Sequence, residues 1–170
     1  MLSKKKLLCL LAALAALWIL LRIISTSPWF LELRIEYLQK QFVKLAIKEE
    51  AALTEIAEEM FEEASGREML CYTDAQKTIS AELENKIDTF LDKSPVKIED
   101  VTFYGFPTYY PGNVCVFDRT LWDRRDFVYA WVGLIYMPEE PEHEPEWYNY
   151  IGSRSIPAVG DWYAVVLYGY

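Results

Sequence analysis

Apolar side chains recur every three or four residues along a stretch without Gly or Pro, residues 30–64. This spacing places them on one helix face, and the Leu, Ala, Glu and Lys between them favour a helix. The members of this apolar stripe are Leu31, Ile35, Leu38, Phe42, Leu45, Leu53, Ile56 and Met60. The stripe has a gap at Glu49. Pro28 suits a first turn and Ser65-Gly66 a C-terminal cap, so we predict a long helix over residues 30–66.

A second, shorter helix is predicted over residues 73–93. Thr73 and Gln76 have the spacing of a capping box at its start, and Ser94-Pro95 marks its end. The apolar residues on one face of this helix are Leu83, Ile87, Phe90 and Leu91. The short apolar stretch Met69–Tyr72 between the two helices fits either a strand or a connector.

The pattern changes in residues 95–170, which are rich in Val, Ile and aromatic residues, as strands are. The predicted strands lie near residues 96–106, 113–118, 126–137 and 160–169. Tyr110–Asn113 reads as a tight turn between the first two, with Pro at its second and Gly at its third position. Residues 127–137 are apolar on both faces, which indicates a central strand covered on both sides. The predicted fold class is α+β, with two helices followed by an antiparallel sheet of about four strands.

The first residues of the sequence have the pattern of an export segment. Three lysines at residues 4–6 precede an uninterrupted apolar run over residues 7–21. Ile23 and Ile24 extend this run toward the roughly 20 residues that a bilayer crossing needs. We expect residues 7–27 to contact the membrane.

Two fates of this segment are open. Ser25 and Ser27 are the best small residues for a signal peptidase, but Pro28 follows at once and makes cleavage unfavourable. We therefore predict a signal anchor over residues 1–29, with the cytoplasmic end at the lysines and an extracytoplasmic domain over residues 30–170. A cleaved signal peptide, and hence a secreted protein, is the alternative.

Charge narrows the choice of partners. The chain has a net charge of −9, and residues 1–30 carry four basic and no acidic side chains. The remaining 140 residues therefore have a net charge of −13. Such an acidic domain repels phosphate, so nucleic acid is not expected as a partner and direct binding of anionic lipid by this domain is disfavoured.

Two cysteines lie after the export segment, Cys71 and Cys115. Outside the cytoplasm they are a possible disulfide, and the alternative is a pair of buried free thiols, because Cys is often buried. No CxxC motif is present, and we predict neither a metal site nor a cofactor.

Motifs for catalysis are scarce. His143 is the single histidine and lies in an acidic, Pro-rich stretch, residues 138–150, which we interpret as a solvated loop. There is no phosphate loop, dinucleotide fingerprint or nucleophile elbow, so no catalytic residue is predicted. One enzymatic alternative is a cell-wall or glycan hydrolase that uses a carboxylate pair. The carboxylates considered for that pair are Glu99, Asp100, Asp118, Asp123 and Asp161.

Aromatic residues are the remaining signal, because 18 of the chain's 26 lie after residue 100. Buried, they form a core; exposed, Tyr, Trp and Arg are typical of binding surfaces. The candidate binding residues are Tyr104, Tyr109, Tyr110, Arg124, Arg125, Trp147, Tyr148 and Tyr150. We predict a membrane-anchored binding module whose partner is another envelope protein or a second copy. A structural stalk, dimerised in parallel along residues 31–64, is a further alternative.

Overall fold

The computed structural model describes residues 6, 11, 13–20, 28–72, 79–105, 113–122, 129–138 and 154–169. The chain divides into two compact units, Met1–Arg34 and Ile35–Tyr170. In the first unit, residues 13–20 and 28–34 are helical, and most of the predicted membrane segment 7–27 lies outside the described residues. Within the part of the chain that is described, no helix combines the length and the apolar character that a membrane crossing requires. The signal anchor stays a prediction.

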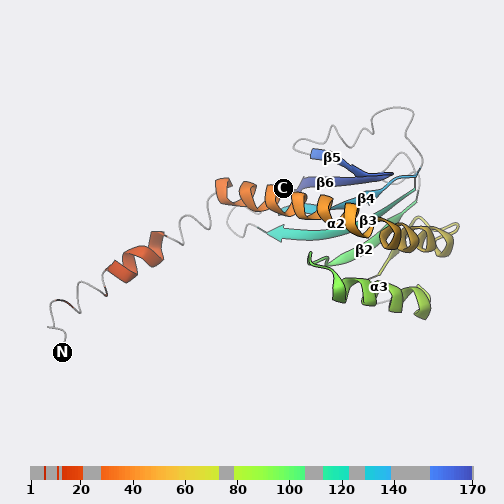
Figure 1. Ribbon diagram of the computed structural model, residues 1–170, viewed down its shortest axis with the longest axis horizontal. Coiled ribbons are helices and arrows are strands. Elements are labelled where there is room, and N and C mark those ends of the chain that lie inside the picture. Colours follow the sequence, from red (N-terminus) through yellow and green to blue (C-terminus); the bar gives the residue numbers. More distant parts are fainter. Residues whose placement is uncertain are drawn as a thin grey trace. The chain divides into compact units, whose positions relative to one another are not determined.

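The predicted α+β class is confirmed, with a six-stranded antiparallel sheet in the second unit (Figure 1). In chain order the elements are α2 (Pro28–Glu63), β1 (Met69–Cys71), α3 (Ala81–Lys93), β2 (Asp100–Tyr104), β3 (Val114–Trp122), β4 (Tyr129–Tyr136), β5 (Arg154–Val159) and β6 (Trp162–Gly169). The strands are ordered β1-β2-β3-β4-β6-β5 across the sheet. β4 pairs with β3 on one side and β6 on the other, which is the central position that its apolar sequence predicts.

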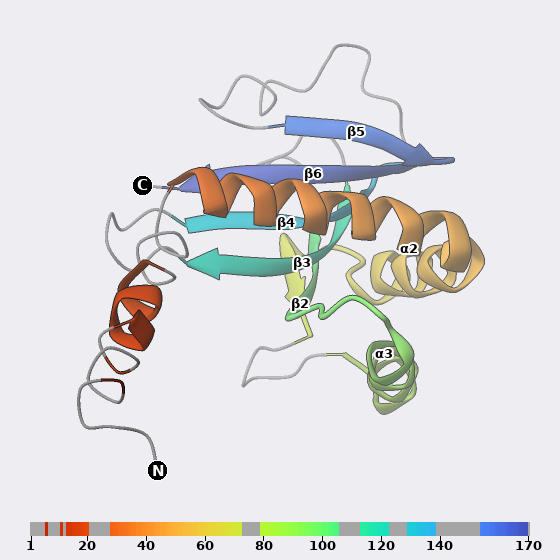
Figure 2. The same ribbon diagram turned by 60° about the vertical axis from the view of Figure 1, so that its left-hand side comes forward.

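Helix α2 lies across one face of the sheet and forms the core with it (Figure 2). The members of the apolar stripe that are buried are Ile35, Leu38, Phe42, Leu45, Leu53, Ile56 and Met60. Two polar contacts fix the helix on the sheet: Gln39 Nε2 donates to the Ala164 carbonyl, and Trp162 Nε1 donates to Thr54 Oγ1, each at 3.0 Å. Because its own sheet buries this stripe, the stripe is not available for the parallel dimer of the stalk alternative.

The gap in the apolar stripe at Glu49 coincides with a kink in α2. Glu49 has non-helical backbone angles (φ −117°, ψ 23°), so α2 is two helical segments joined by a kink. The helix ends near Gly66, whose φ of 80° favours glycine, and the Arg67 N–H donates to the Ala64 carbonyl at 2.7 Å.

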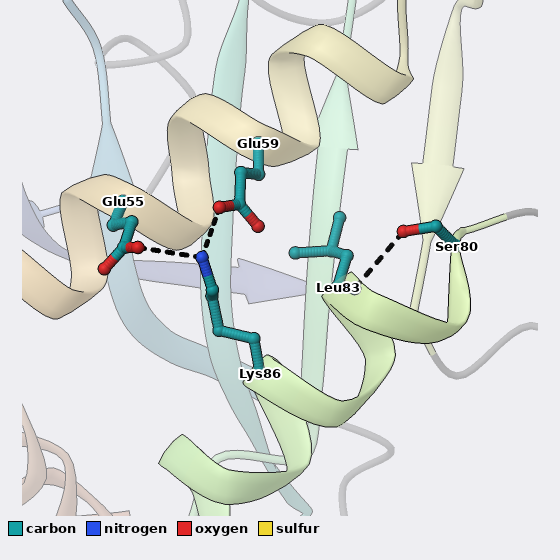
Figure 3. Close-up of polar contacts among 5 residues, drawn as sticks. All are labelled: Glu55, Glu59, Ser80, Leu83 and Lys86. Atoms are coloured by element: carbon teal, nitrogen blue, oxygen red, sulfur yellow. Dashed lines mark hydrogen bonds and ion pairs between the residues drawn. The ribbon is translucent and has the colours of Figure 1, made fainter.

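Helix α3 begins later than predicted, at Ala81 rather than near residue 73. Ser80 is its N-cap and accepts a hydrogen bond from the Leu83 N–H at 3.2 Å (Figure 3). The proposed cap at Thr73 lies outside the described residues.

One lysine of α3 ties this helix to α2. Lys86 Nζ lies between two glutamates of α2, 2.8 Å from Glu55 Oε1 and in hydrogen-bond contact with Glu59 Oε1 (Figure 3). These hydrogen bonds raise the pKa of Lys86 to about 12.

The sheet has more strands than the predicted four. The strand predicted near residues 160–169 is β6, and β5 precedes it as the other strand of a hairpin that turns at Gly160 with a φ of 51°. β5 was missed because Pro157 disrupts its strand pattern, and such a residue is tolerated only at a sheet edge, where β5 lies. The predicted turn at 110–113 lies mostly outside the described residues, but β2 and β3 are antiparallel neighbours as expected.

Both α2 and α3 pack against the same sheet face. Ring contacts join Phe61 to Phe103 at 5.2 Å, Phe90 to Phe117 at 6.2 Å and Phe117 to Trp162 at 5.5 Å between centroids. We call this the helix face. The opposite face carries a second buried cluster, which consists of Val114, Val116, Ile135, Met137 and Val165.

Candidate functional site

Strand alternation and register bring two carboxylates, Asp100 and Asp118, to one end of the face opposite the helices. Phe117 points to the helix face, so Asp118, its neighbour on β3, points the other way. Asp118 pairs in register with Asp100 on β2 and with Gly133 on β4. Directly paired residues have Cβ atoms about 4.5–5.5 Å apart, so the side chains of Asp100 and Asp118 are neighbours.

These carboxylates line a hollow of about 210 Å³, which we call the acidic pocket. Its lining residues are Glu99, Asp100, Tyr104, Val116, Asp118, Thr120, Trp131, Gly133, Val165 and Leu167. Trp131 is 44% exposed, whereas Val116 and Val165 are buried. The pocket therefore combines an apolar floor, acidic walls and one exposed aromatic ring.

Gly133 is required for this arrangement. A Cβ at this position would lie 2.3 Å from the Phe117 carbonyl oxygen and 2.9 Å from the Asp118 Cα. Any side chain there would collide with β3. The glycine thus allows close approach of β3 and β4 and leaves free the space beside Asp118.

Asp100 is held in place by donors from its own sheet. Its Oδ2 accepts hydrogen bonds from Cys71 Sγ and Thr102 Oγ1, each at 3.0 Å, and its Oδ1 accepts from the Val101 N–H at 2.9 Å. Thr102 is buried. Three donors fix the orientation of this carboxylate.

Asp118 is in the opposite situation. Its pKa is raised to about 7, first by burial and then by the negative charges of Asp100 and Glu99. Within the described residues, no hydrogen bond or ion pair engages its carboxyl group. Burial, together with Asp118 and Asp100, also raises the pKa of the nearby Tyr104 hydroxyl to about 12.

Glu99 differs from both because it has cationic neighbours. Burial alone would raise its pKa, but Lys97 Nζ at 2.9 Å, the Thr120 N–H at 3.3 Å and Arg119 Nε at 3.8 Å together lower it. The described cationic side chains of this region, Lys97 and Arg119, therefore both lie beside Glu99. Among the described residues of the acidic pocket, Asp118 is the carboxyl group that neither a cation nor a hydrogen-bond donor engages.

Few of the predicted binding residues can be placed. Tyr104 is half-buried and lines the acidic pocket. The others lie outside the described residues: Tyr109, Tyr110, Arg124, Arg125, Trp147, Tyr148 and Tyr150. His143 and Asp123 lie outside them too, and Asp161 is exposed in the turn between β5 and β6.

No disulfide joins Cys71 and Cys115 in the structure. Cys71 pairs with Thr102 and points to the pocket face, while Cys115 pairs with Phe103 and is completely buried on the helix face. β2 lies between their strands, so the sheet separates the possible disulfide partners. Burial raises the pKa of the Cys115 thiol and makes it a poor nucleophile.

A larger groove of about 700 Å³ lies between α2 and α3. Two of its lysines are already paired, Lys48 with Glu49 at 2.6 Å and Lys86 with Glu55 at 2.8 Å. Two of the three lysines that line this groove are thus paired within the fold. The smaller acidic pocket is therefore the better candidate for a functional site.

Trp131, Gly133 and Thr120 were missed as site residues. The signal that was available is Gly133, an isolated glycine within the apolar stretch 127–137, which marks close backbone approach or a ligand. No group of three His, Cys, Asp or Glu residues suited to a metal ion occurs in the described part of the chain. No protein-family model, curated protein or solved structure matches this chain.

Proposed function

We propose that the protein is a binding module whose acidic pocket accepts a cationic side chain, lysine or arginine, of a partner protein. The observation that carries the proposal is Asp118, a carboxyl group that is mostly buried, raised in pKa to about 7 and surrounded by negative charge. An external cation would supply the compensation that the described residues do not.

The rest of the pocket suits the same ligand. Asp100 presents an oriented carboxylate beside Asp118, so an ammonium or guanidinium group entering the pocket meets two acceptors. Trp131 is exposed at the rim, where its ring can cover the alkyl stem and attract the charge. Val116, Val165 and Leu167 provide apolar contact for that stem.

The test is an NMR titration of the full chain with Nα-acetyl-lysine methylamide, observed at the Trp131 indole N–H. The neutral norleucine analogue is the matched control ligand. We expect saturable shifts with the lysine compound alone, and affinity that falls about tenfold per pH unit below pH 7, because protons compete with the cation for Asp118.

Variants make the test specific to the pocket. Asp118→Asn and Asp100→Asn should each weaken lysine binding, whereas Asp161→Asn, an exposed aspartate outside the pocket, should not. Equal binding of the norleucine analogue, or an equal loss in Asp161→Asn, would contradict the proposal.

A carboxylate-pair hydrolase is the second candidate, favoured by the register pairing of Asp100 with Asp118. Two neighbouring carboxyl groups, of which one has a pKa raised to about 7, resemble the acid and nucleophile of a glycosidase. This candidate predicts glycan hydrolysis that is lost in both Asp100→Asn and Asp118→Asn. Lysine binding without hydrolysis of any glycan assayed would favour the binding module.

We also propose that the module is exported and anchored by residues 7–27. The support is the sequence pattern of three lysines followed by a long apolar run. Intact mass of the protein from the membrane and the medium of its host tests this. Full-length chain in the membrane agrees with the anchor, and a form in the medium that lacks the first 27 or so residues contradicts it.

A further inference from the structure

A second exposed surface lies on α2, on the side away from the sheet. Tyr37, Lys40, Lys44 and Ile47 follow the spacing i, i+3, i+7 and i+10, which places them on one helix face. All four are exposed, with Tyr37 at 66% and Ile47 at 59%. We call these residues the outer stripe.

Charge is strongly divided along α2. Residues 35–48 contain three lysines and one glutamate, for a net charge of +2, whereas residues 49–63 contain seven glutamates and no basic residue, for −7. Within the described residues, neither Lys40 nor Lys44 forms an ion pair. The first half of the helix is therefore a local cationic surface on an acidic domain.

We propose that the outer stripe rests on the anionic headgroups of a membrane. Exposed Tyr and Ile flank two lysines, and this combination suits an interface where aromatic and aliphatic groups enter the headgroup layer and ammonium groups meet lipid phosphate. A second copy fits poorly, because a parallel pairing along this stripe would oppose lysine to lysine.

The net charge of the domain does not oppose this docking. Screening limits electrostatic interaction to about 8–10 Å in physiological salt, so the local lysines govern the contact. Anionic lipid is disfavoured in the sequence analysis on the basis of net charge, and this segregation of charge along α2 is the reason for proposing the contact nonetheless. The inference does not depend on the acidic pocket.

The test is lysine footprinting of the full chain in nanodiscs. Acetylation rates of Lys40 and Lys44 are compared between nanodiscs of phosphatidylcholine and nanodiscs that also contain phosphatidylglycerol. Contact with an anionic surface favours the bound state of each lysine by a factor of about five. We therefore expect the acetylation of Lys40 and of Lys44 to slow about fivefold in the anionic nanodiscs. Lys93, exposed at the end of α3, is the internal control and should not change.

Two variants identify the apolar contribution. Tyr37→Ser/Ile47→Ser keeps the reporter lysines and should reduce their protection, whereas Met69→Ser/Ile156→Ser removes exposed apolar side chains elsewhere and should leave it intact. Equal acetylation in both nanodiscs, or equal slowing at Lys93, would overturn the proposal. Equal protection by soluble polyglutamate would also overturn it and indicate an acidic protein partner.

Discussion

Phe117 and Asp118 are adjacent on β3 and point to opposite faces of one sheet. Phe117 is completely buried and contacts Phe90 of α3 and Trp162 of β6. Asp118 is also mostly buried, but its neighbours are carboxylates that raise its pKa. Side chains on the helix face thus stabilise the fold, whereas the ionised form of Asp118, at the pocket end of the other face, destabilises it. Such an uncompensated group is typical of a site selected for function.

The largest expected effect is on the helix face. Phe117→Ala should lower the free energy of unfolding by about 4 kcal/mol, because it leaves a cavity between the helices and the sheet. Chemical denaturation measures this. Val116→Ala, the neighbouring substitution on the other face, should cost less, and an equal or larger loss would show that the helix face is not the main core.

Asp118→Asn should change the stability by a similar amount, with the opposite sign. The folded pKa of Asp118, about 7, lies above its ordinary 3.8, so the folded state binds the extra proton between these values. Stability that is present below pH 4 is therefore lost as pH rises through 7, by about 4 kcal/mol. The asparagine variant should be more stable by about that amount at pH 8 and equal near pH 4.

Denaturation of both proteins at several pH values tests this, with Asp161→Asn as the control. Stability curves for wild type and Asp118→Asn that run parallel from pH 4 to 8 would show that Asp118 carries no uncompensated charge.

Thr102→Val tests how Asp100 is held. Thr102 is buried and its hydroxyl donates to Asp100 Oδ2 at 3.0 Å. Loss of a hydrogen bond to a charged group should destabilise the protein by about 2 kcal/mol and also weaken lysine binding. Thr54→Val, which removes the acceptor for Trp162 Nε1 on the helix face, should destabilise the fold without a change in lysine affinity.

Trp131→Ala should have the smallest effect on stability, because the ring is 44% exposed. Its effect on lysine binding should be larger, a loss of about fivefold, as the cation then lacks its aromatic partner. Calorimetric titration gives the affinity. Unchanged affinity would restrict the binding site to the carboxylates.

Much of the fold follows from the sequence. Three features were predicted from local sequence patterns and are present in the structure. They are the apolar stripe of α2, its gap at Glu49 and the central strand β4. β5 was missed because an edge strand containing Pro157 is stabilised by pairing with β6 and not by its own sequence.

The site was less accessible to prediction. Asp100 and Asp118 were considered as members of a carboxylate pair, but their pairing depends on the register of β2 with β3, which sequence does not reveal. Trp131 was one aromatic residue among many. Its relevance depends on Gly133 and Asp118 lying beside it, which is a property of the folded sheet.

The central claim is that Asp118 is an uncompensated carboxyl group that accepts a cation. Titration of its side-chain carbon by ¹³C NMR, with and without saturating acetyl-lysine methylamide, tests this most directly. We predict a pKa near 7 in the free protein, which falls by at least about one unit with the ligand because the cation favours the ionised form. A pKa close to the ordinary 3.8, or one that the ligand does not move, would contradict the claim.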